Sequence, residues 1–309
     1  MSLPKRIIIT GATGLIGKRV SKALRERGES LVVFSRDTPD ARQAVRGAAE
    51  YVAWQPEEQG AWSNAVPGAH AVIHLAGASI YGQRWTEEYK RTIRDSRVIG
   101  TRGIVNAMAR AAVRPKVFIC GSAVGYYGPR DDTPLDEDAP PGDDFLAKVC
   151  VEWEQEARKA EALGIRTVIV RTGIVLDPHE GALPQMMLPF RLFAGGPIMP
   201  GTQWFPWVHV DDEVGIILKA LDDPQVSGPV NATAPNPQTN ADFTRTLGTV
   251  LGRPSWLPVP QFGLKLALGQ FAESLTTGQR VLPARMQQLG YEFKYPTSEA
   301  ALRQLLGNS

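Results

Sequence analysis

The chain has 309 residues, of which 43% are hydrophobic and 21% are charged. This is an ordinary globular composition with enough apolar side chains for a sizeable core, which excludes disorder as the main state. The 34 Lys and Arg residues nearly balance the 32 Asp and Glu residues. A net charge of +2 excludes a chain-wide field for binding nucleic acid, so any anion must be bound locally.

The two cysteines, Cys120 and Cys150, fit neither a disulfide framework nor a zinc-ligand spacing, and the four histidines lack the paired spacing of a metal site. We therefore expect a reducing compartment and no metal. The apolar run after Lys5 and Arg6 covers only residues 7–9, too few for a signal peptide, and no window approaches about 18 apolar residues. We expect a cytoplasmic protein with no membrane partner and no nucleic-acid partner.

Short apolar runs alternate with helical periodicity over the first two thirds of the chain. Strands are predicted at residues 7–9, 31–34, 71–75, 117–120 and 166–171, and helices at residues 15–27, 86–112 and 145–163. Near-continuously apolar strands separated by helices indicate parallel βαβ crossovers. The predicted fold class is therefore α/β, a Rossmann-type doubly wound parallel sheet.

The pattern changes after about residue 171. The density of Pro and Gly between residues 178 and 201 predicts long loops over the carboxyl ends of the strands, where open α/β sheets bind ligands. Further helices are predicted at residues 211–220, 262–273 and 298–306. We expect a dinucleotide-binding domain over residues 1–235, with cap segments from about 178–206, and a small, mostly helical C-terminal cap or substrate module over residues 236–309. The charged stretch 152–161 is interpreted as the solvated face of a helix.

Three glycines, Gly11, Gly14 and Gly17, follow the first predicted strand and open the first predicted helix. In this context Gly11 permits the tight turn, Gly14 lets the backbone approach a pyrophosphate, and Gly17 lets the helix pack closely on the sheet. Free N–H groups at the start of the helix then bind the anion. The turn therefore predicts a dinucleotide site.

The end of the second strand decides between the two nicotinamide cofactors. An acid about 20 residues past the glycine motif binds the ribose hydroxyl of NAD, but this chain has Ser35 and Arg36 there. A guanidinium and a hydroxyl suit the 2′-phosphate of NADP. The alternative is that Arg36 is a solvated turn residue and that Asp37 binds the ribose. We expect NADP, with NAD less favoured.

Several motifs resemble those of the extended short-chain dehydrogenase/reductase family, in its nucleotide-sugar epimerase branch. They are Gly11-x-x-Gly14-x-x-Gly17, His74-Leu75-Ala76-Gly77 and Trp207-Val208-His209-Val210-Asp211-Asp212. A second set is similar to the atypical "epimerase family" proteins, sometimes labelled cell-division-inhibitor-like. This set is Arg84-Trp85-Thr86, Ser96-Arg97-Val98, Tyr126-Tyr127-Gly128, Gly195-Gly196-Pro197-Ile198, Gln203-Trp204-Phe205-Pro206-Trp207 and Gln279-Arg280-Val281-Leu282-Pro283. The resemblance runs almost end to end.

The resemblance implies a set of cofactor-binding residues. For the pyrophosphate they are Gly11, Thr13, Gly14, Leu15, Ile16 and Gly17; for the adenosine phosphate, Ser35 and Arg36; for the loop beneath the ribose, Leu75, Ala76 and Gly77; and for the nicotinamide side, Arg171, Gly173 and Val175. Gly121 and Ser122 are also expected to bind the cofactor. Arg97, also expected to contact the cofactor, stands where better-known relatives have a buried asparagine. The apolar members of this set would also be expected at strand ends without a ligand.

The catalytic residues of the superfamily are not all present. Ordinary members use a Ser or Thr and a Tyr-x-x-x-Lys pair on a helix, in which the ammonium lowers the pKa of the phenol. Here Lys148 follows Asp144 instead of a tyrosine, and the expected hydroxyl falls at Ala123, next to Ser122. In one interpretation Tyr126 or Tyr127 supplies the phenol, with Ser122 or Arg97 as partner. In a second interpretation Asp144 itself acts in catalysis, although a surface ion pair with Lys148 is more typical of this spacing. In a third, no chemistry occurs.

The sequence therefore leads to two hypotheses of function. One is an NADP-dependent oxidoreductase or epimerase-like enzyme that acts on an unknown carbonyl, hydroxyl or nucleotide-sugar-like small molecule. The other is a non-catalytic NADPH-binding regulator. We expect Trp204 and Phe205 to line a substrate pocket, and we expect Trp207 to lie in the core with His209 satisfied at a strand end. A nucleotide-sugar substrate would also need basic residues such as Arg191, Lys219 and Arg280. Long helices on the sheet are compatible with a homodimer.

Overall fold

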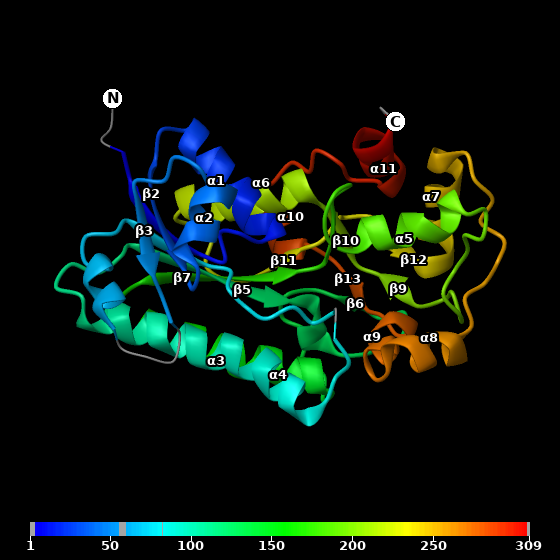
Figure 1. Ribbon diagram of the computed structural model, residues 1–309, viewed down its shortest axis with the longest axis horizontal. Coiled ribbons are helices and arrows are strands. Elements are labelled where there is room, and N and C mark those ends of the chain that lie inside the picture. Colours follow the sequence, from blue (N-terminus) through cyan, green and yellow to red (C-terminus); the bar gives the residue numbers. More distant parts are fainter. Residues whose placement is uncertain (1–3, 56–59, 82, 308–309) are drawn as a thin grey trace.

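The computed structural model describes residues 4–55, 60–81 and 83–307. Its centre is a seven-stranded parallel sheet in the order β11-β7-β5-β4-β1-β2-β3 (Figure 1). The strands are β1 (Arg6–Thr10), β2 (Ser30–Ser35), β3 (Glu50–Ala53), β4 (Ala71–His74), β5 (Val117–Ala123), β7 (Arg166–Thr172) and β11 (Gly228–Ala232). The predicted doubly wound α/β fold is confirmed. The strand order reverses at β1 and β4, the position where such sheets bind ligands.

Helices cover both faces of the sheet, as Figure 1 shows. On one face lie α3 (Glu87–Arg110) and α4 (Phe145–Arg158), and on the other α1 (Leu15–Glu26), α2 (Thr38–Ala44) and α6 (Val210–Asp222). Side chains of β1 alternate between the two layers, with Ile7 and Ile9 in one buried cluster and Ile8 in the other. This burial on both faces explains why the strand is a continuous apolar run.

The cap is more helical than the sequence predicted. Its helices are α5 (Ala182–Arg191), α7 (Asn240–Leu251), α8 (Gln261–Leu268), α9 (Phe271–Thr276) and α11 (Ser298–Leu306). The prediction of loops throughout 178–201 is wrong at α5, where Leu183, Met187 and Phe190 repeat at helical spacing and are buried. Pro184 is tolerated because the first N–H groups of a helix have no intrahelical partner. The helix expected at 262–273 is divided by Gly269, whose φ is +63°.

Small sheets join the cap to the main sheet. They pair β8 (Ile174–Leu176) with β10 (Trp207–His209), β9 (Trp204–Phe205) with β12 (Gln238–Thr239), and β6 (Pro134–Leu135) with β13 (Arg280–Val281). After β13 the chain returns to the sheet, where Met286 of α10 (Ala284–Gln288) packs in the same cluster as β1. The segment past residue 236 therefore does not stay within the cap.

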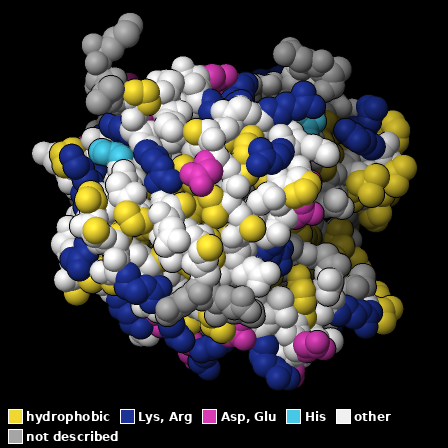
Figure 2. Space-filling model, turned by 60° about the vertical axis from the view of Figure 1, so that its left-hand side comes forward, with side chains coloured by type: hydrophobic (Ala, Val, Ile, Leu, Met, Phe, Trp, Pro, Cys, Tyr) yellow, Lys and Arg dark blue, Asp and Glu magenta, His cyan; other side chains and the backbone are white. Residues whose placement is uncertain are grey.

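Three further observations concern the surface charges, the helices and the residues that could bind a metal. Figure 2 shows Lys and Arg side chains spread over the displayed face rather than gathered in one band. Among the described residues, no helix combines the length and apolar character needed to cross a bilayer. In the same part of the chain no group of His, Cys, Asp and Glu is arranged to hold a metal ion.

Candidate functional site

The glycine-rich turn joins β1 to α1 through three positions with different surroundings. A Cβ at Gly11, whose φ is +67°, would lie 2.6 Å from the carbonyl carbon of Leu75, and one at Gly17 would lie 2.1 Å from the Gly11 carbonyl oxygen. These two glycines are needed for close packing within the protein. A Cβ at Gly14 would meet only the Gly11 oxygen, at 3.4 Å, and Gly14 is exposed. The turn therefore leaves its outer side open to a ligand.

The start of α1 has the properties of an anion site. Its N-cap, Gly14, has no side chain to cap the helix, and its first turn contains no acidic residue. The first N–H groups of a helix have no intrahelical partner and carry the positive end of the helix dipole. Leu15 and Ile16 are only half-buried, so their amides can face a phosphate at the reversal point of the sheet.

The residues after β2 distinguish between the two interpretations of this segment. The Ser35 hydroxyl donates to the Asp37 carbonyl oxygen at 2.9 Å, and Asp37 Oδ1 accepts the amide of Asp40 at 3.0 Å, which caps α2. The Asp37 carboxylate is therefore engaged by its own helix. Arg36 is exposed and forms no ion pair with any described residue. The free charged group at this position is a cation, as recognition of a 2′-phosphate requires.

A buried histidine holds the next loop. His74 Nδ1 lies 2.7 Å from the Thr10 hydroxyl, which accepts the amide of Ala76 at 3.2 Å. Burial lowers the pKa of His74 to about 3, so the ring is neutral. Its neighbours are aromatic: Trp54 stands edge-on at 5.8 Å and Phe118 stacks at 6.4 Å, both between centroids. These contacts fix the loop of Leu75, Ala76 and Gly77 beside the glycine-rich turn.

The loop after β8 reaches the same turn from the other side. A Cβ at Gly181 would lie 3.0 Å from Leu15 Cδ1 and 3.8 Å from the Val175 carbonyl oxygen. Two ion pairs tie this loop to α1: Arg19 with Asp177 at 2.5 Å, and Lys18 with Glu180 at 2.7 Å. The structure thus brings the segment from Val175 to Gly181 against the predicted pyrophosphate residues.

Arg171, at the end of β7, is the centre of a buried polar network. Its Nε and Nη2 donate to the two carboxylate oxygens of Glu154 at 2.8 and 2.9 Å, and its Nη1 donates to the Tyr127 hydroxyl at 3.0 Å. Both members of the ion pair are almost fully buried. Burial alone would lower the pKa of Arg171, but the pair with Glu154 raises it. Ser122 donates to Glu154 Oε1 at 2.7 Å, and Tyr127 donates to Asn231 Oδ1 at 2.7 Å.

The three catalytic candidates therefore gather around Arg171. Tyr127 is fully buried, burial raises its pKa to about 12, and its hydroxyl both donates and accepts within the network. Ser122 is 5% exposed and donates its hydrogen bond to Glu154. Neither hydroxyl is placed to exchange a proton with a substrate, which argues against their expected catalytic roles. Tyr126 stacks its ring 3.5 Å from Arg171 Cζ, and its hydroxyl has no partner among the described residues.

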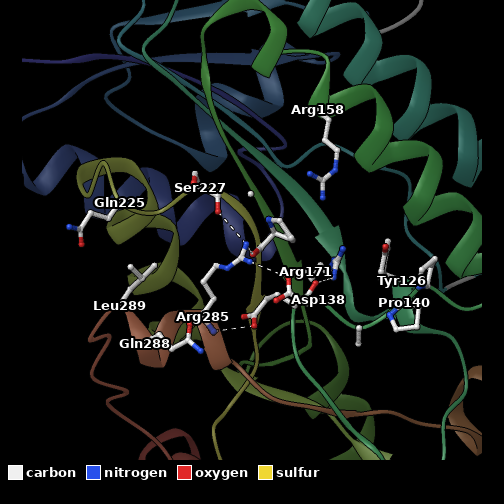
Figure 3. A pocket seen from close by; sticks show the side chains of 15 residues that line it. Tyr126, Asp138, Pro140, Arg158, Arg171, Gln225, Ser227, Arg285, Gln288 and Leu289 are labelled. Atoms are coloured by element: carbon white, nitrogen blue, oxygen red, sulfur yellow. Dashed lines mark hydrogen bonds and ion pairs between the residues drawn. The ribbon is translucent and has the colours of Figure 1, made fainter.

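A groove of about 840 Å³ lies beyond this network, along the outer strand β11 (Figure 3). Its side chains are largely committed to one another. Arg285 donates to the Pro229 carbonyl oxygen at 2.9 Å, and Glu137 accepts the amides of Asn231 at 3.0 Å and of Arg285 at 3.1 Å. These contacts close the hydrogen-bonding edge of the sheet. Of the predicted site residues, Arg171 and the catalytic candidate Tyr126 line the groove, and the glycine-rich turn does not.

Comparisons with known proteins agree with this geometry. The model described as "NAD dependent epimerase/dehydratase family" matches residues 7–232, and "Domain of unknown function (DUF1731)" matches residues 259–305. The chain belongs to the NAD dependent epimerase/dehydratase family. It is 43% identical to the Arabidopsis thaliana "Epimerase family protein SDR39U1 homolog, chloroplastic", over 97% of this chain and 86% of that protein. It is 40% identical to "Epimerase family protein YfhF" of Bacillus subtilis, over 98% of both.

Solved structures show the same fold. The human epimerase family protein SDR39U1, crystallised with NADPH, has a TM-score of 0.87 and 34% identity, over 98% of this chain and 100% of that one. A UDP-glucuronic acid 4-epimerase from Bacillus cereus has a TM-score of 0.78 but only 16% identity, over 98% of this chain and 99% of that one, and so shares the fold alone. The resemblance to the epimerase family proteins is confirmed.

Family membership makes the register of α4 important. Asp144 is its N-cap and accepts the amide of Ala147 at 2.7 Å, while Lys148 is exposed. The two side chains form no ion pair with each other, although their spacing is typical of one. The positions that face the site with Tyr-x-x-x-Lys spacing are Leu146 and Cys150. A Cβ at Gly125 would lie 3.5 Å from Leu146 Cβ, and the Cys150 thiol lies beside Ser122. Burial raises the pKa of Cys150 to about 12, so it is a neutral thiol.

The structure corrects two further expectations. The segment 152–161 is not uniformly solvated, since Glu154 and Glu156 are 3% and 6% exposed. Phe205 is buried in the cap core against Phe243, with 4.4 Å between ring centroids. Trp204 is half-buried and donates to Asp132 at 2.9 Å. The sequence contains a signal for Glu154. Ala147, Cys150, Glu154 and Ala157 share helical spacing, which places an acid on the buried face.

Other expectations agree with the contacts. Trp207 is 1% exposed and lies in the cap core. His209 accepts the Asp211 amide at Nδ1, at 3.0 Å, and its Nε2 lies 2.9 Å from Gln304 Oε1, so the imidazole is satisfied. Of the basic residues suggested for a second anionic group, Lys219 is paired with Asp223 at 2.9 Å. Arg280 lies over the ring of Trp204, 4.8 Å from its centroid.

Proposed function

We propose that this protein binds NADPH at the start of α1 and at the end of β2. The amides of Leu15 and Ile16 would hold the pyrophosphate, Gly14 would allow its close approach, and Ser35 and Arg36 would hold the 2′-phosphate. The observation that carries the proposal is the pairing of an uncapped helix start with a free guanidinium where NAD-binding chains place an acid. The NADPH-containing human relative supports this choice.

We further propose that the protein is an oxidoreductase for a small molecule. When bound, NADPH supplies a hydride, and the chain binds and orients the acceptor. Ser122 and Tyr127 are committed to the Arg171 network, so the proton that follows the hydride does not come from them. Tyr126 keeps an unpartnered hydroxyl among the described residues and is the candidate that remains from the sequence. Replacing Tyr126 with Phe should lower turnover, whereas replacing Tyr127 with Phe should mainly lower stability.

Calorimetry with NADP⁺ and NAD⁺ tests the cofactor. Wild type should prefer NADP⁺, and Arg36→Ala should lose roughly tenfold or more in NADP⁺ affinity with little change for NAD⁺, because charge-assisted hydrogen bonds to phosphate are lost. Arg110→Ala is the matched control, since Arg110 is exposed at the far end of α3. Unchanged preference in Arg36→Ala would show that Arg36 does not read the phosphate.

A second function, an NADPH-binding regulator without turnover, is favoured by one observation. The two positions with Tyr-x-x-x-Lys spacing on α4 hold an aliphatic side chain and a neutral thiol, neither of which transfers a proton at neutral pH. A panel of carbonyl compounds and nucleotide sugars distinguishes the two functions. A regulator binds NADPH and oxidises none of it, while an oxidoreductase consumes NADPH with at least one member of the panel.

A further inference from the structure

Exposed apolar side chains are concentrated at one end of the cap. Among the described residues, ten large hydrophobic side chains are exposed, and eight of them fall within two short segments, 188–199 and 256–266. The most exposed are Phe262 and Leu266 of α8, at 78% and 77%. Exposed apolar residues are normally scattered singly over a protein, whereas a gathered set marks an interaction surface. We call these two segments the apolar patch.

The two segments of the apolar patch lie side by side. The Gly195 carbonyl oxygen accepts the amides of Trp256 and Leu257 at 3.0 and 3.1 Å. Further along, the Met199 amide donates to the Val259 carbonyl oxygen at 3.0 Å, and α8 follows directly. In Figure 1, α5 and α8 lie at the end of the molecule opposite β2 and β3. The exposed side chains of both segments therefore belong to one surface of the cap.

Phe193 holds its place in the apolar patch at a cost to the backbone. Its φ is +58°, and among the described residues it is the one non-glycine residue with a positive φ. It follows the end of α5, where the left-handed conformation favours glycine because a side chain strains it. Its ring lies 4.5 Å from the guanidinium carbon of Arg253, and the residue is 57% exposed. A strained, exposed aromatic residue points to a role outside the fold.

The formal charge of the apolar patch and its borders is positive. Residues 182–201 and 252–268 contain Arg191, Arg253 and Lys265 and no Asp or Glu. All three cations are exposed, and the pairing of Lys265 with exposed Glu273 of α9, at 3.8 Å, is a weak solvated one. Apolar side chains bordered by Lys and Arg are typical of surfaces that lie on anionic membranes. A second copy fits poorly, because in a two-fold contact the three cations would face the same three cations.

We propose that the cap docks on an anionic lipid surface through the apolar patch. Phe262 and Leu266 are four residues apart and so share one face of α8. They project from the surface instead of lining a groove, which suits insertion among lipid chains better than docking of a partner helix. The three cations would contact the lipid phosphates. Such contact needs neither a spanning helix nor a signal peptide, the two features on which the expectation of no membrane partner was based. It goes beyond the proposed function and does not depend on it.

Flotation of the full chain with lipid vesicles tests the proposal. Wild type should float with vesicles of phosphatidylcholine and phosphatidylglycerol, less with phosphatidylcholine alone, and less at high salt. The double variant Phe262→Ser, Leu266→Ser should bind the mixed vesicles about tenfold or more weakly. Phe193→Gly should also weaken vesicle binding but melt no lower than wild type, because glycine relieves the positive φ. Loss of binding in Phe193→Gly then cannot be attributed to unfolding.

Val113→Ser is the matched control, because Val113 is 63% exposed in the loop between α3 and β5, outside the apolar patch. Its vesicle binding should equal that of wild type. Three results would overturn the inference: no flotation of wild type with the mixed vesicles, equal flotation with both kinds of vesicle, or equal binding by the double variant. Sedimentation equilibrium identifies the alternative occupant. If wild type forms dimers without floating and the double variant is a monomer, a second copy covers the patch and the lipid proposal is wrong.

Discussion

Glu213 on α6 allows a direct test of how strongly the sheet–helix layer excludes water. It is fully buried, accepts the Thr172 hydroxyl at Oε1, at 2.8 Å, and has no partner for Oε2. Burial raises its pKa from 4.5 to about 8, opposed in part by the Thr172 hydrogen bond. An acid whose pKa is higher in the folded state than in the unfolded state contributes fully to stability below its unfolded pKa of 4.5. This contribution is lost as the pH rises to about 8. At about 1.36 kcal/mol per unit, the loss is about 4 to 5 kcal/mol.

Glu213→Gln keeps the acceptor for Thr172 and removes the titration. We measure the free energy of unfolding of both proteins in urea from pH 5 to pH 8. The difference between variant and wild type should shift in favour of the variant by about 3 kcal/mol or more across that range. Glu292→Gln, at an exposed acid with no ion pair among the described residues, should stay parallel to wild type. If Glu213→Gln also runs parallel to wild type, Glu213 ionises freely in the folded protein and the reasoning is refuted.

Three other perturbations test the remaining contacts. Glu154→Gln should lower the free energy of unfolding by about 3 kcal/mol, because it leaves the buried Arg171 without its counterion; urea denaturation checks this, and a loss below about 1 kcal/mol would contradict it. Gly17→Ala should lower both the melting temperature and NADPH affinity, since its Cβ would lie 2.1 Å from the Gly11 oxygen; unchanged calorimetry would contradict it. Because burial lowers the pKa of His74 from 6.5 to about 3, the free energy of unfolding of wild type should fall by about 1.4 kcal/mol per pH unit as the pH drops below 6.5. In acid unfolding, His74→Asn should show a smaller dependence on pH.

The sequence predicted the inner strands and the glycine-rich turn because their patterns are local. In β1 three consecutive isoleucines face alternate layers, so burial on both sides is visible as an unbroken apolar run. The outer strands were missed for the opposite reason. β3 has exposed ends, and β11 begins with Gly228 and Pro229, which resemble a turn. An edge strand gains its hydrogen bonds from one neighbour only, so its sequence is less constrained.

The polar site could be predicted only in part, because its members are distant in the sequence. Ser122 at the end of β5 and Tyr127 just after it were recognisable as hydroxyls. Glu154 and Arg171, which occupy their hydrogen bonds, lie 32 and 44 residues away. The register of α4 was misjudged because the sequence offers Lys148 for the lysine position of the Tyr-x-x-x-Lys spacing. In the structure Lys148 is exposed, and the buried residue at that position is Cys150. Only the packing of α4 on the sheet decides which face of the helix points inward.

Arg171 and Arg97 are two guanidinium groups with different surroundings. Arg171 has a carboxylate from its own chain and hydrogen bonds for all three nitrogens, so its charge is neutralised within the fold. Among the described residues, Arg97 has one carbonyl oxygen as a partner and no carboxylate. Breaking a neutralised pair costs stability, whereas removing an unpaired cation removes a desolvation penalty. Arg97→Met should therefore unfold at no lower urea concentration than wild type, whereas Arg171→Met should unfold at a clearly lower one.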